Sequence, residues 1–343
     1  MLKYIKDLII LSTILIVPFA CQEANTGEQP NVSSNIEMTG IPTVDKISKE
    51  IAEKPESPEL YALRSDAYSK EDLYGEAVKD AERALKLDTT QLKYYRLLAN
   101  AYFDNEQSRP ATKTLERALN IFPKDIETIL SLSEMYLIIQ QYDKAIIHLD
   151  NLFKSSPQNA DGLFLKGMVM KEMGDTIQAV ENFQAAVEAD ADMLNAHVQL
   201  GTLFTALGRS IALRYYDNAL IIDSTNYDAL WKKADYFHEQ KNYDEAMVWY
   251  DKLIYHYPQN AEVQYNAGLM QMEKEDYEKA FWLFDNATKF EPTFGEAYYF
   301  KGEAAENLNK KEEAIRYYQE AVNLNERWGW AKEALKRLNV EVE

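Results

Sequence analysis

Alanine returns along this chain at a nearly constant interval, and this spacing constrains the fold more than any other feature. Successive members lie 34 residues apart, with one interval of 33: Ala77, Ala111, Ala145, Ala179, Ala212, Ala246, Ala280 and Ala314. A period of this size is typical of a solenoid, in which like supersecondary units stack and each contacts its neighbours. The spacing therefore predicts an extended array of repeats.

Small and large residues alternate within each repeat in a helical pattern. When the alanine is counted as the twentieth residue, the eighth residues are all small: Ser65, Ala99, Ser133, Gly167, Gly201, Ala234, Gly268 and Gly302. Large residues recur at the eleventh and twenty-fourth places, at spacings of three, four and seven that predict two helices per repeat. The expected breaks carry glycine or proline: Gly174 and Gly208 between the two helices, and Pro123, Pro157, Pro258 and Pro292 at the ends of repeats.

These residues resemble the consensus of the tetratricopeptide repeat (TPR) family over residues 58–328. The resemblance implies an all-α, right-handed superhelical solenoid of about eight helix-turn-helix repeats: 58–91, 92–125, 126–159, 160–193, 194–226, 227–260, 261–294 and 295–328. Repeats 1, 4, 5 and 8 lack the closing proline, and repeat 5 is one residue short. Residues 43–57 and 329–343 are predicted to form terminal capping helices, since the ends of such arrays need a polar cover.

The N-terminus has the features of a secretory signal. Lys3 and Lys6 precede an apolar run from Leu8 to Phe19 that is too short for a comfortable transmembrane helix. The segment Pro18-Phe19-Ala20-Cys21 resembles a bacterial lipoprotein lipobox of the looser kind found among Bacteroidota. Residues 1–20 are therefore expected to be a signal peptide and Cys21 the lipidated residue; the alternative is an incidental cysteine in an ordinary signal peptide.

Residues 21–42 are expected to form a disordered tether between membrane and solenoid, because their polar composition offers little apolar surface to bury. The full chain carries a formal net charge of −19. This charge disfavours nucleic acid and anionic lipid surfaces as direct partners, since both attract basic surfaces. It is compatible with a basic protein or peptide partner.

The sequence offers no arrangement of residues typical of an active site. The 4 histidines form no His-x-x-x-His pair, and neither Gly-x-Ser-x-Gly nor Gly-x-x-x-x-Gly-Lys occurs. Carboxylate pairs are too numerous to indicate a site. We therefore expect no enzyme activity, no cofactor and no metal site.

The resemblance to TPR arrays also implies a partner-binding groove lined by the first helix of each repeat. Its second, fifth, ninth and twelfth residues are expected to point inward. From repeat 4 onward the fifth residues form an apolar and aromatic series: Phe164, Val198, Trp231, Tyr265 and Tyr299. Two interpretations stay open, because such residues either contact a partner or pack into the core between helices.

Charged residues line the same predicted groove. Asp235 and Glu303 belong to a recurrent set of acids that would suit a basic or amide-rich peptide, although acids in a first helical turn also interact favourably with the helix dipole. Arg96 and Asn100 resemble the first pair of a carboxylate-clamp TPR. The next repeats offer Ser131, Asp161 and Leu165, so that clamp is not expected to form.

The combined expectation is a lipid-anchored scaffold that holds a protein or peptide partner in its concave groove, in cell-envelope assembly or secretion. Its expected location is the bacterial outer membrane, on the periplasmic face or the cell surface. The alternative is a surface-exposed lipoprotein that binds another ligand or a glycan.

Overall fold

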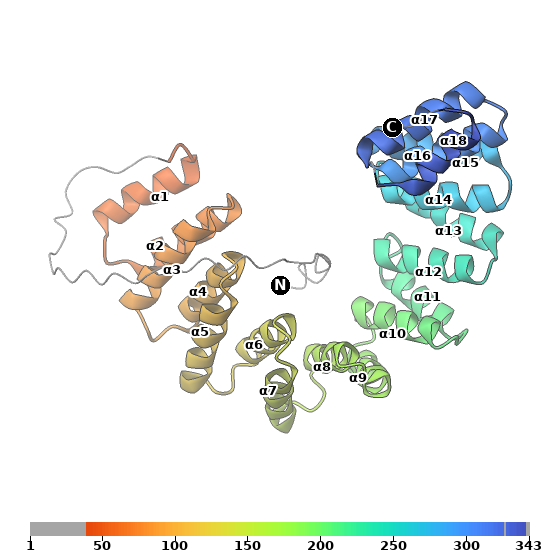
Figure 1. The fold of residues 1–343 in the computed structure, drawn as a ribbon. Helices are drawn as coiled ribbons and strands as arrows, with labels where there is room; N and C mark the ends of the chain where they lie inside the picture. The colour runs from red at the N-terminus through yellow and green to blue at the C-terminus, as the bar shows by residue number, and fades with distance from the viewer. Residues whose placement is uncertain (1–38, 326, 341–343) are drawn as a thin grey trace. The chain divides into compact units, whose positions relative to one another are not determined.

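The structure is a computed structural model that describes residues 39–325 and 327–340 (Figure 1). Within these ranges the chain forms 18 α-helices and no strand, so the all-α prediction is confirmed. The chain divides into two compact units, residues 1–157 (unit 1) and 158–343 (unit 2). The predicted signal peptide, Cys21 and the tether up to residue 38 lie outside the described residues.

Unit 1 contains a leading helix followed by three helix pairs. The leading helix is α1 (Pro42–Glu53), which overlaps the predicted N-terminal cap. The first helices of the pairs are α2 (Pro58–Lys70), α4 (Leu92–Asp104) and α6 (Ile126–Ile138). The second helices are α3 (Tyr74–Leu87), α5 (Ser108–Ile121) and α7 (Tyr142–Ser155). Residues 39–40 fold back on α1, where the backbone N–H groups of Thr39 and Gly40 donate to the Asp45 carboxylate at 2.7 and 3.1 Å.

Unit 2 contains five helix pairs and a closing helix. Its first helices are α8 (Ala160–Glu172), α10 (Leu194–Ala206), α12 (Tyr227–Glu239), α14 (Ala261–Glu273) and α16 (Gly295–Asn307). Its second helices are α9 (Thr176–Ala189), α11 (Ala212–Ile222), α13 (Tyr243–His256), α15 (Tyr277–Phe290) and α17 (Lys311–Leu324). The closing helix α18 (Gly329–Arg337) overlaps the predicted C-terminal cap. In both units the extensive contacts join helices that are adjacent or next but one along the chain.

The repeated alanine lies at the centre of each helix pair. All eight of these alanines have 0% exposure. Four repeats place glycine at the eighth position directly against an aromatic ring of the second helix: Gly167 on Phe183, Gly201 on Tyr216, Gly268 on Phe284 and Gly302 on Tyr318. At these four positions a side chain larger than a hydrogen atom would therefore collide with the ring.

The turn between the two helices of each pair has one residue in the left-handed conformation. This residue is glycine in two repeats, Gly174 and Gly208, and a non-glycine residue with φ between 56° and 59° in the other six: Asp72, Glu106, Gln140, Lys241, Glu275 and Asn309. Repeat 5 accommodates its missing residue just after this turn. There the second helix α11 has 11 residues, whereas the other second helices have 14.

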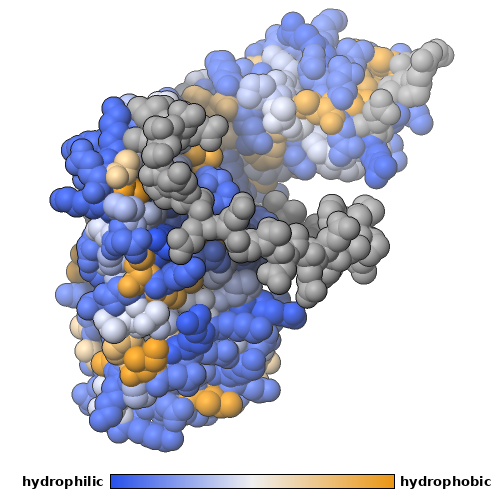
Figure 2. All heavy atoms as spheres, turned by 90° about the vertical axis from the view of Figure 1, so that its left-hand side faces the viewer, coloured by the Kyte–Doolittle hydropathy of each residue, from blue (hydrophilic) through white to orange (hydrophobic). Residues whose placement is uncertain are grey.

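The surface is predominantly polar. On the face drawn in Figure 2, hydrophilic residues predominate and hydrophobic residues form separate patches. Among the described residues, no helix combines the length and the apolar character that crossing a membrane requires.

Candidate protein-binding surface

Arg96 and Asn100 lie on α4 in unit 1, and Arg96 is already paired with acids of the next repeat. Its Nη1 contacts the Glu127 carboxylate and lies 3.7 Å from Asp125 Oδ2. The pairing is electrostatic, because Nη1 is buried without a hydrogen bond of good geometry. An arginine that is paired with acids of its own chain is a poor receptor for a partner's carboxylate.

The first two members of the aromatic series in unit 2 lie mostly in the interior. Phe164 on α8 is 6% exposed, and its ring packs against Phe183 with centroids 5.5 Å apart. Val198 on α10 is 7% exposed and packs against the buried Ala219 and Ala229. Little of either side chain is left for a partner, so at these two positions the packing interpretation fits the geometry better.

Trp231 on α12 is only partly buried. Its ring stacks on Tyr227 with centroids 5.7 Å apart and meets Tyr250 edge-on at 6.0 Å. Tyr227 in turn meets Tyr257 edge-on at 5.1 Å. Asp235 lies one turn further along α12 and is also partly exposed. Trp231 therefore belongs to an aromatic group that is held on several sides and open on another.

Tyr265 on α14 is held by three rings of its own and the following repeat. Phe284, Phe294 and Phe300 lie with centroids 5.9, 4.8 and 5.8 Å from the Tyr265 ring. Burial, together with the nearby charge of Glu296, raises the pKa of Tyr265 to about 12. Its hydroxyl therefore stays protonated at neutral pH and can act as a hydrogen-bond donor to a partner.

Tyr299 on α16 forms part of an aromatic and acidic corner with α18. Trp330 meets the Tyr299 ring edge-on at 4.6 Å and stacks on Trp328 at 5.2 Å, and 41% of Trp330 remains exposed. Glu303 lies one turn beyond Tyr299 on α16 and is partly buried.

The two carboxylates of this corner, Glu303 and Glu306, differ in their hydrogen-bond partners. Glu306 accepts from the Tyr318 hydroxyl at 2.9 Å and from Arg337 Nη2 at 2.7 Å. Among the described residues, the Glu303 carboxylate has no hydrogen-bond or ion-pair partner. Burial raises the pKa of Glu303, although the Arg337 charge opposes this shift. Glu303 is thus a partly desolvated acid that can accept a hydrogen bond or pair with a cation.

The predicted groove residues therefore do not form one cluster, and Tyr265 lies by itself on α14. Tyr299 and Glu303 come together in one corner, and Trp231 and Asp235 share α12. Phe164 lies mainly in the interior, and Arg96 and Asn100 belong to unit 1. Sequence reasoning missed Trp330, because residues 329–343 were assigned only a capping role. The closely spaced tryptophans at 328 and 330, directly after the last repeat, were the available signal.

Comparison with protein families identifies the repeats directly. Two families described as tetratricopeptide repeat match residues 209–261 and residues 160–193. The chain contains tetratricopeptide repeats. A family described as anaphase-promoting complex, cyclosome, subunit 3 also matches residues 70–152 and 239–321 of this TPR protein.

Curated relatives and solved structures are similar to this TPR protein over part of their length. BBSome complex member BBS4 of Bos taurus is 27% identical over 237 residues, which cover 59% of this chain and 46% of the relative. Type IV pilus assembly protein PilF of Pseudomonas aeruginosa is 30% identical over 146 residues, which cover 39% of this chain and 57% of the relative. The chain spans about half the length of most of the curated relatives it matches.

Among solved structures, a tetratricopeptide repeat protein from Parabacteroides merdae has a TM-score of 0.50 at 16% identity, over 72% of this chain and 98% of that chain. The type IV pilus biogenesis factor PilW has a TM-score of 0.51 at 18% identity, over 61% of this chain and 97% of that chain. At these identities the likeness concerns the fold alone.

Proposed function

We propose that this TPR protein is a non-enzymatic scaffold that holds an extended segment of a protein partner on the first-helix face of unit 2. The observation that carries the proposal is the corner formed by Tyr299, Trp330 and Glu303. It combines an exposed tryptophan, a second aromatic ring and a partly desolvated carboxylate that has no hydrogen-bond or ion-pair partner among the described residues. Aromatic anchors with an accessible edge dominate the energy of protein interfaces.

The charge of the surface favours a basic or amide-rich segment. Asp228, Asp235, Glu262 and Glu296 lie on the first helices α12, α14 and α16, on the same helices as the partly exposed aromatic residues. A partner carrying lysine or arginine would be attracted by this field before it made contact. The chain's net charge of −19 acts in the same direction.

We further propose that the scaffold is anchored by lipid at Cys21 in the bacterial outer membrane and serves in assembly or secretion at the cell envelope. Support comes from the lipobox-like Pro18-Phe19-Ala20-Cys21 segment after the apolar run. The similarity to a protein named for type IV pilus assembly is in keeping with such a role.

The binding site is tested by chemical cross-linking in native membranes, followed by mass spectrometry of the captured proteins. Trp231→Ala, Tyr265→Ala and Trp330→Ala are each expected to reduce capture of a specific partner at least about tenfold, the effect of a hot-spot residue. Trp282→Ala is the matched control, because Trp282 is 57% exposed on the second helix α15 and lies outside the proposed surface. Loss of thermal stability with unchanged capture would show that the aromatic residues are only core.

The anchor is tested separately by Cys21→Ser and by metabolic labelling with a fatty acid. The wild-type chain should incorporate label and stay with the outer membrane, whereas the variant should do neither. Mass spectrometry of the mature N-terminus then checks the site directly. A mature protein without acyl chains at Cys21 would end the anchoring proposal and leave the binding proposal intact.

A further inference from the structure

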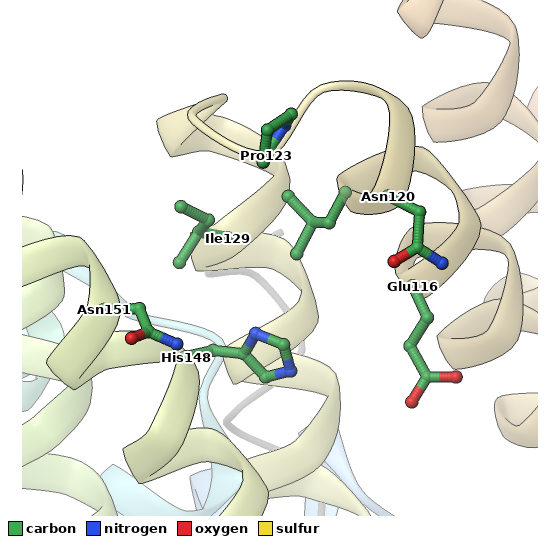
Figure 3. Close-up of a pocket in the computed structure, with 7 residues that line it drawn as sticks. Glu116, Asn120, Pro123, Ile129, His148 and Asn151 are labelled. Atoms are coloured by element: carbon green, nitrogen blue, oxygen red, sulfur yellow. The ribbon is translucent and has the colours of Figure 1, made fainter.

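Unit 1 contains a cavity lined mainly by residues of its second helices α5 and α7. Its volume is about 420 Å³, which is in the range of small-ligand sites. The polar lining comes from α5 and α7, as Figure 3 shows, and consists of Glu116, Asn120, His148 and Asn151. The apolar lining consists of Leu119, Pro123 and Ile129.

The Glu116 carboxylate is held in place by the repeat that follows it. The hydroxyl of Tyr136, which is 1% exposed, donates to Glu116 Oε1. The Tyr136 ring is itself fixed by His148, which stacks on it at 5.8 Å with an interplanar angle of 11°. A carboxylate fixed in this way loses little conformational freedom when it binds a ligand.

The same tyrosine–glutamate hydrogen bond occurs one repeat earlier, but two sequence positions that accompany it carry different residues. There the Tyr102 hydroxyl donates to Glu82, and the charge of Arg117 acts on Tyr102 by lowering its pKa, against the dominant effect of burial. Arg117 occupies the twenty-sixth position of its repeat, and Asn151 occupies the same position in the next. Lys86 and Asn120 correspond in the same manner at the twenty-ninth position. At these two repeat positions the cations Lys86 and Arg117 are thus replaced by the amides Asn120 and Asn151.

The cavity consequently has a negative charge that no ion pair among the described residues neutralises. Within the described part of the chain, Glu116 makes no ion pair. Burial lowers the pKa of His148, and Lys144 acts in the same direction against the opposing charge of Glu116, so the imidazole is neutral at pH 7. Lys144 lies over the Tyr136 ring, 5.0 Å from its centroid, and is not among the residues that line the cavity.

We propose that this cavity binds an arginine side chain carried on an extended segment of a second protein partner. The planar guanidinium pairs with the fixed Glu116 carboxylate. Arginine binds a carboxylate better than lysine does in this geometry, because it can donate two parallel hydrogen bonds. Leu119, Pro123 and Ile129 contact the alkyl stem. The side-chain amides of Asn120 on α5 and Asn151 on α7 supply hydrogen-bond donors and acceptors for the backbone of the bound segment.

The test uses the full chain with isotope-labelled imidazoles, which is practical because the chain has only 4 histidines. The probe is the blocked peptide acetyl-Gly-Gly-Arg-Gly-Gly-amide, titrated to millimolar concentration. Its counterpart carries citrulline, which has nearly the shape of arginine without the charge. The arginine peptide should shift the His148 resonances, assigned with His148→Gln, and the citrulline peptide should not.

Three variants decide the result. Glu116→Gln should weaken binding of the arginine peptide about tenfold or more, as expected for the loss of a charge-assisted pair. Asn151→Arg should also abolish binding, because it restores the cation of the preceding repeat while keeping Glu116. Glu82→Gln is the matched control and should leave binding unchanged.

Equal shifts with the citrulline peptide would overturn the proposal. So would unchanged binding by Glu116→Gln, or the absence of any His148 shift. The variants at α12, α14 and α18 that test the groove of unit 2 should not affect this titration, so the two proposals fail independently.

Discussion

At the scale of single residues, the fold depends on matched sizes at the eighth and twenty-fourth positions. Where the second helix presents Phe183, Tyr216, Phe284 or Tyr318, the first helix presents glycine. Where the twenty-fourth residue is smaller, as at Leu115 and Leu149, the eighth is alanine or serine. In six repeats a larger residue at one position thus goes with a smaller one at the other, as close packing requires. Repeats 1 and 6 depart from this rule, with Ser65 and Ala81 in the first and Ala234 and Tyr250 in the second.

Gly201→Ala is expected to destabilise unit 2 by about 1–3 kcal/mol, the usual cost of overpacking. A Cβ at this position would lie 2.4 Å from a ring carbon of Tyr216, which is 1% exposed and cannot move freely. Thermal unfolding followed by circular dichroism measures the effect. Gly75→Ala is the matched control, since a Cβ there meets nothing within 4 Å. Gly75→Ala should keep or raise the stability, because alanine is the better helix former. A Gly201→Ala chain at least as stable as the wild type would contradict the packing argument.

Glu303→Gln is expected to stabilise the folded chain at neutral pH. Burial raises the pKa of Glu303 in the folded state, so folding favours the protonated form. The stability that this group contributes is present below its ordinary pKa and is lost as pH rises through the raised value. The difference in unfolding midpoint between variant and wild type should therefore be small at pH 3 and grow toward pH 7. A constant difference over that range would show that Glu303 keeps the same pKa when it folds.

At the scale of helices, a carboxylate at the twenty-fifth position links each of several second helices to the next repeat. In unit 1, Glu82 and Glu116 accept from Tyr102 and Tyr136. In unit 2, Asp217 and Asp285 pair with Lys233 and Lys301, two lysines that are 6% and 5% exposed. The same position thus fixes the spacing between repeats with two different chemistries.

Asp285→Ala is expected to destabilise the α15–α16 junction by about 3 kcal/mol, the lower end for a broken buried pair, because Asp285 remains 26% exposed. The change leaves Lys301 buried against Tyr317. In the described part of the chain, only Thr288 Oγ1, at 3.4 Å, then remains to accept from its ammonium group. Hydrogen exchange of the α16 amides measures the local loss. The double variant Asp285→Ala with Lys301→Met should recover most of it; a double variant as unstable as the single one would contradict this account.

Sequence periodicity predicted the helices well and their connections poorly. The alanine and glycine positions are where close packing between helices requires a small side chain. The requirement recurs in each repeat and therefore gives a periodic pattern in the sequence. The links through Asp285–Lys301 and Glu116–Tyr136 use different residue types in different repeats. They therefore produce no periodic pattern in the sequence. Of the candidate site, Tyr299 and Glu303 were found by register, whereas Trp330 was missed because α18 follows the last repeat and has no equivalent against which to align it.

At the scale of the whole molecule, negative charge is the dominant feature. The chain has 56 acidic and 37 basic side chains. The described ion pairs engage only part of the acids, and many of the pairs are exposed and contribute little to stability. Repulsion among the remaining acids opposes the folded state more strongly than the unfolded state, because folding brings them closer together.

Added sodium chloride is therefore expected to raise the unfolding temperature of the full chain. Salt at about 0.15 M screens exposed charges beyond roughly 8 Å, which weakens the net repulsion more than the short ion pairs. Differential scanning calorimetry between low and moderate salt measures the shift, with sucrose as a control for effects other than screening. A lower unfolding temperature in salt would show that the attractive pairs outweigh the repulsion.

The restriction of extensive contacts to helices close in sequence has a consequence for how the protein is made. A helix pair meets most of its packing partners within the next few dozen residues, so no early segment waits for the C-terminus before it can bury its apolar side. Each pair can settle as it emerges from a ribosome or from a narrow translocation channel. Synthesis interrupted after α17 would then leave folded repeats with one side of that helix uncovered, until α18 arrived to pack against it.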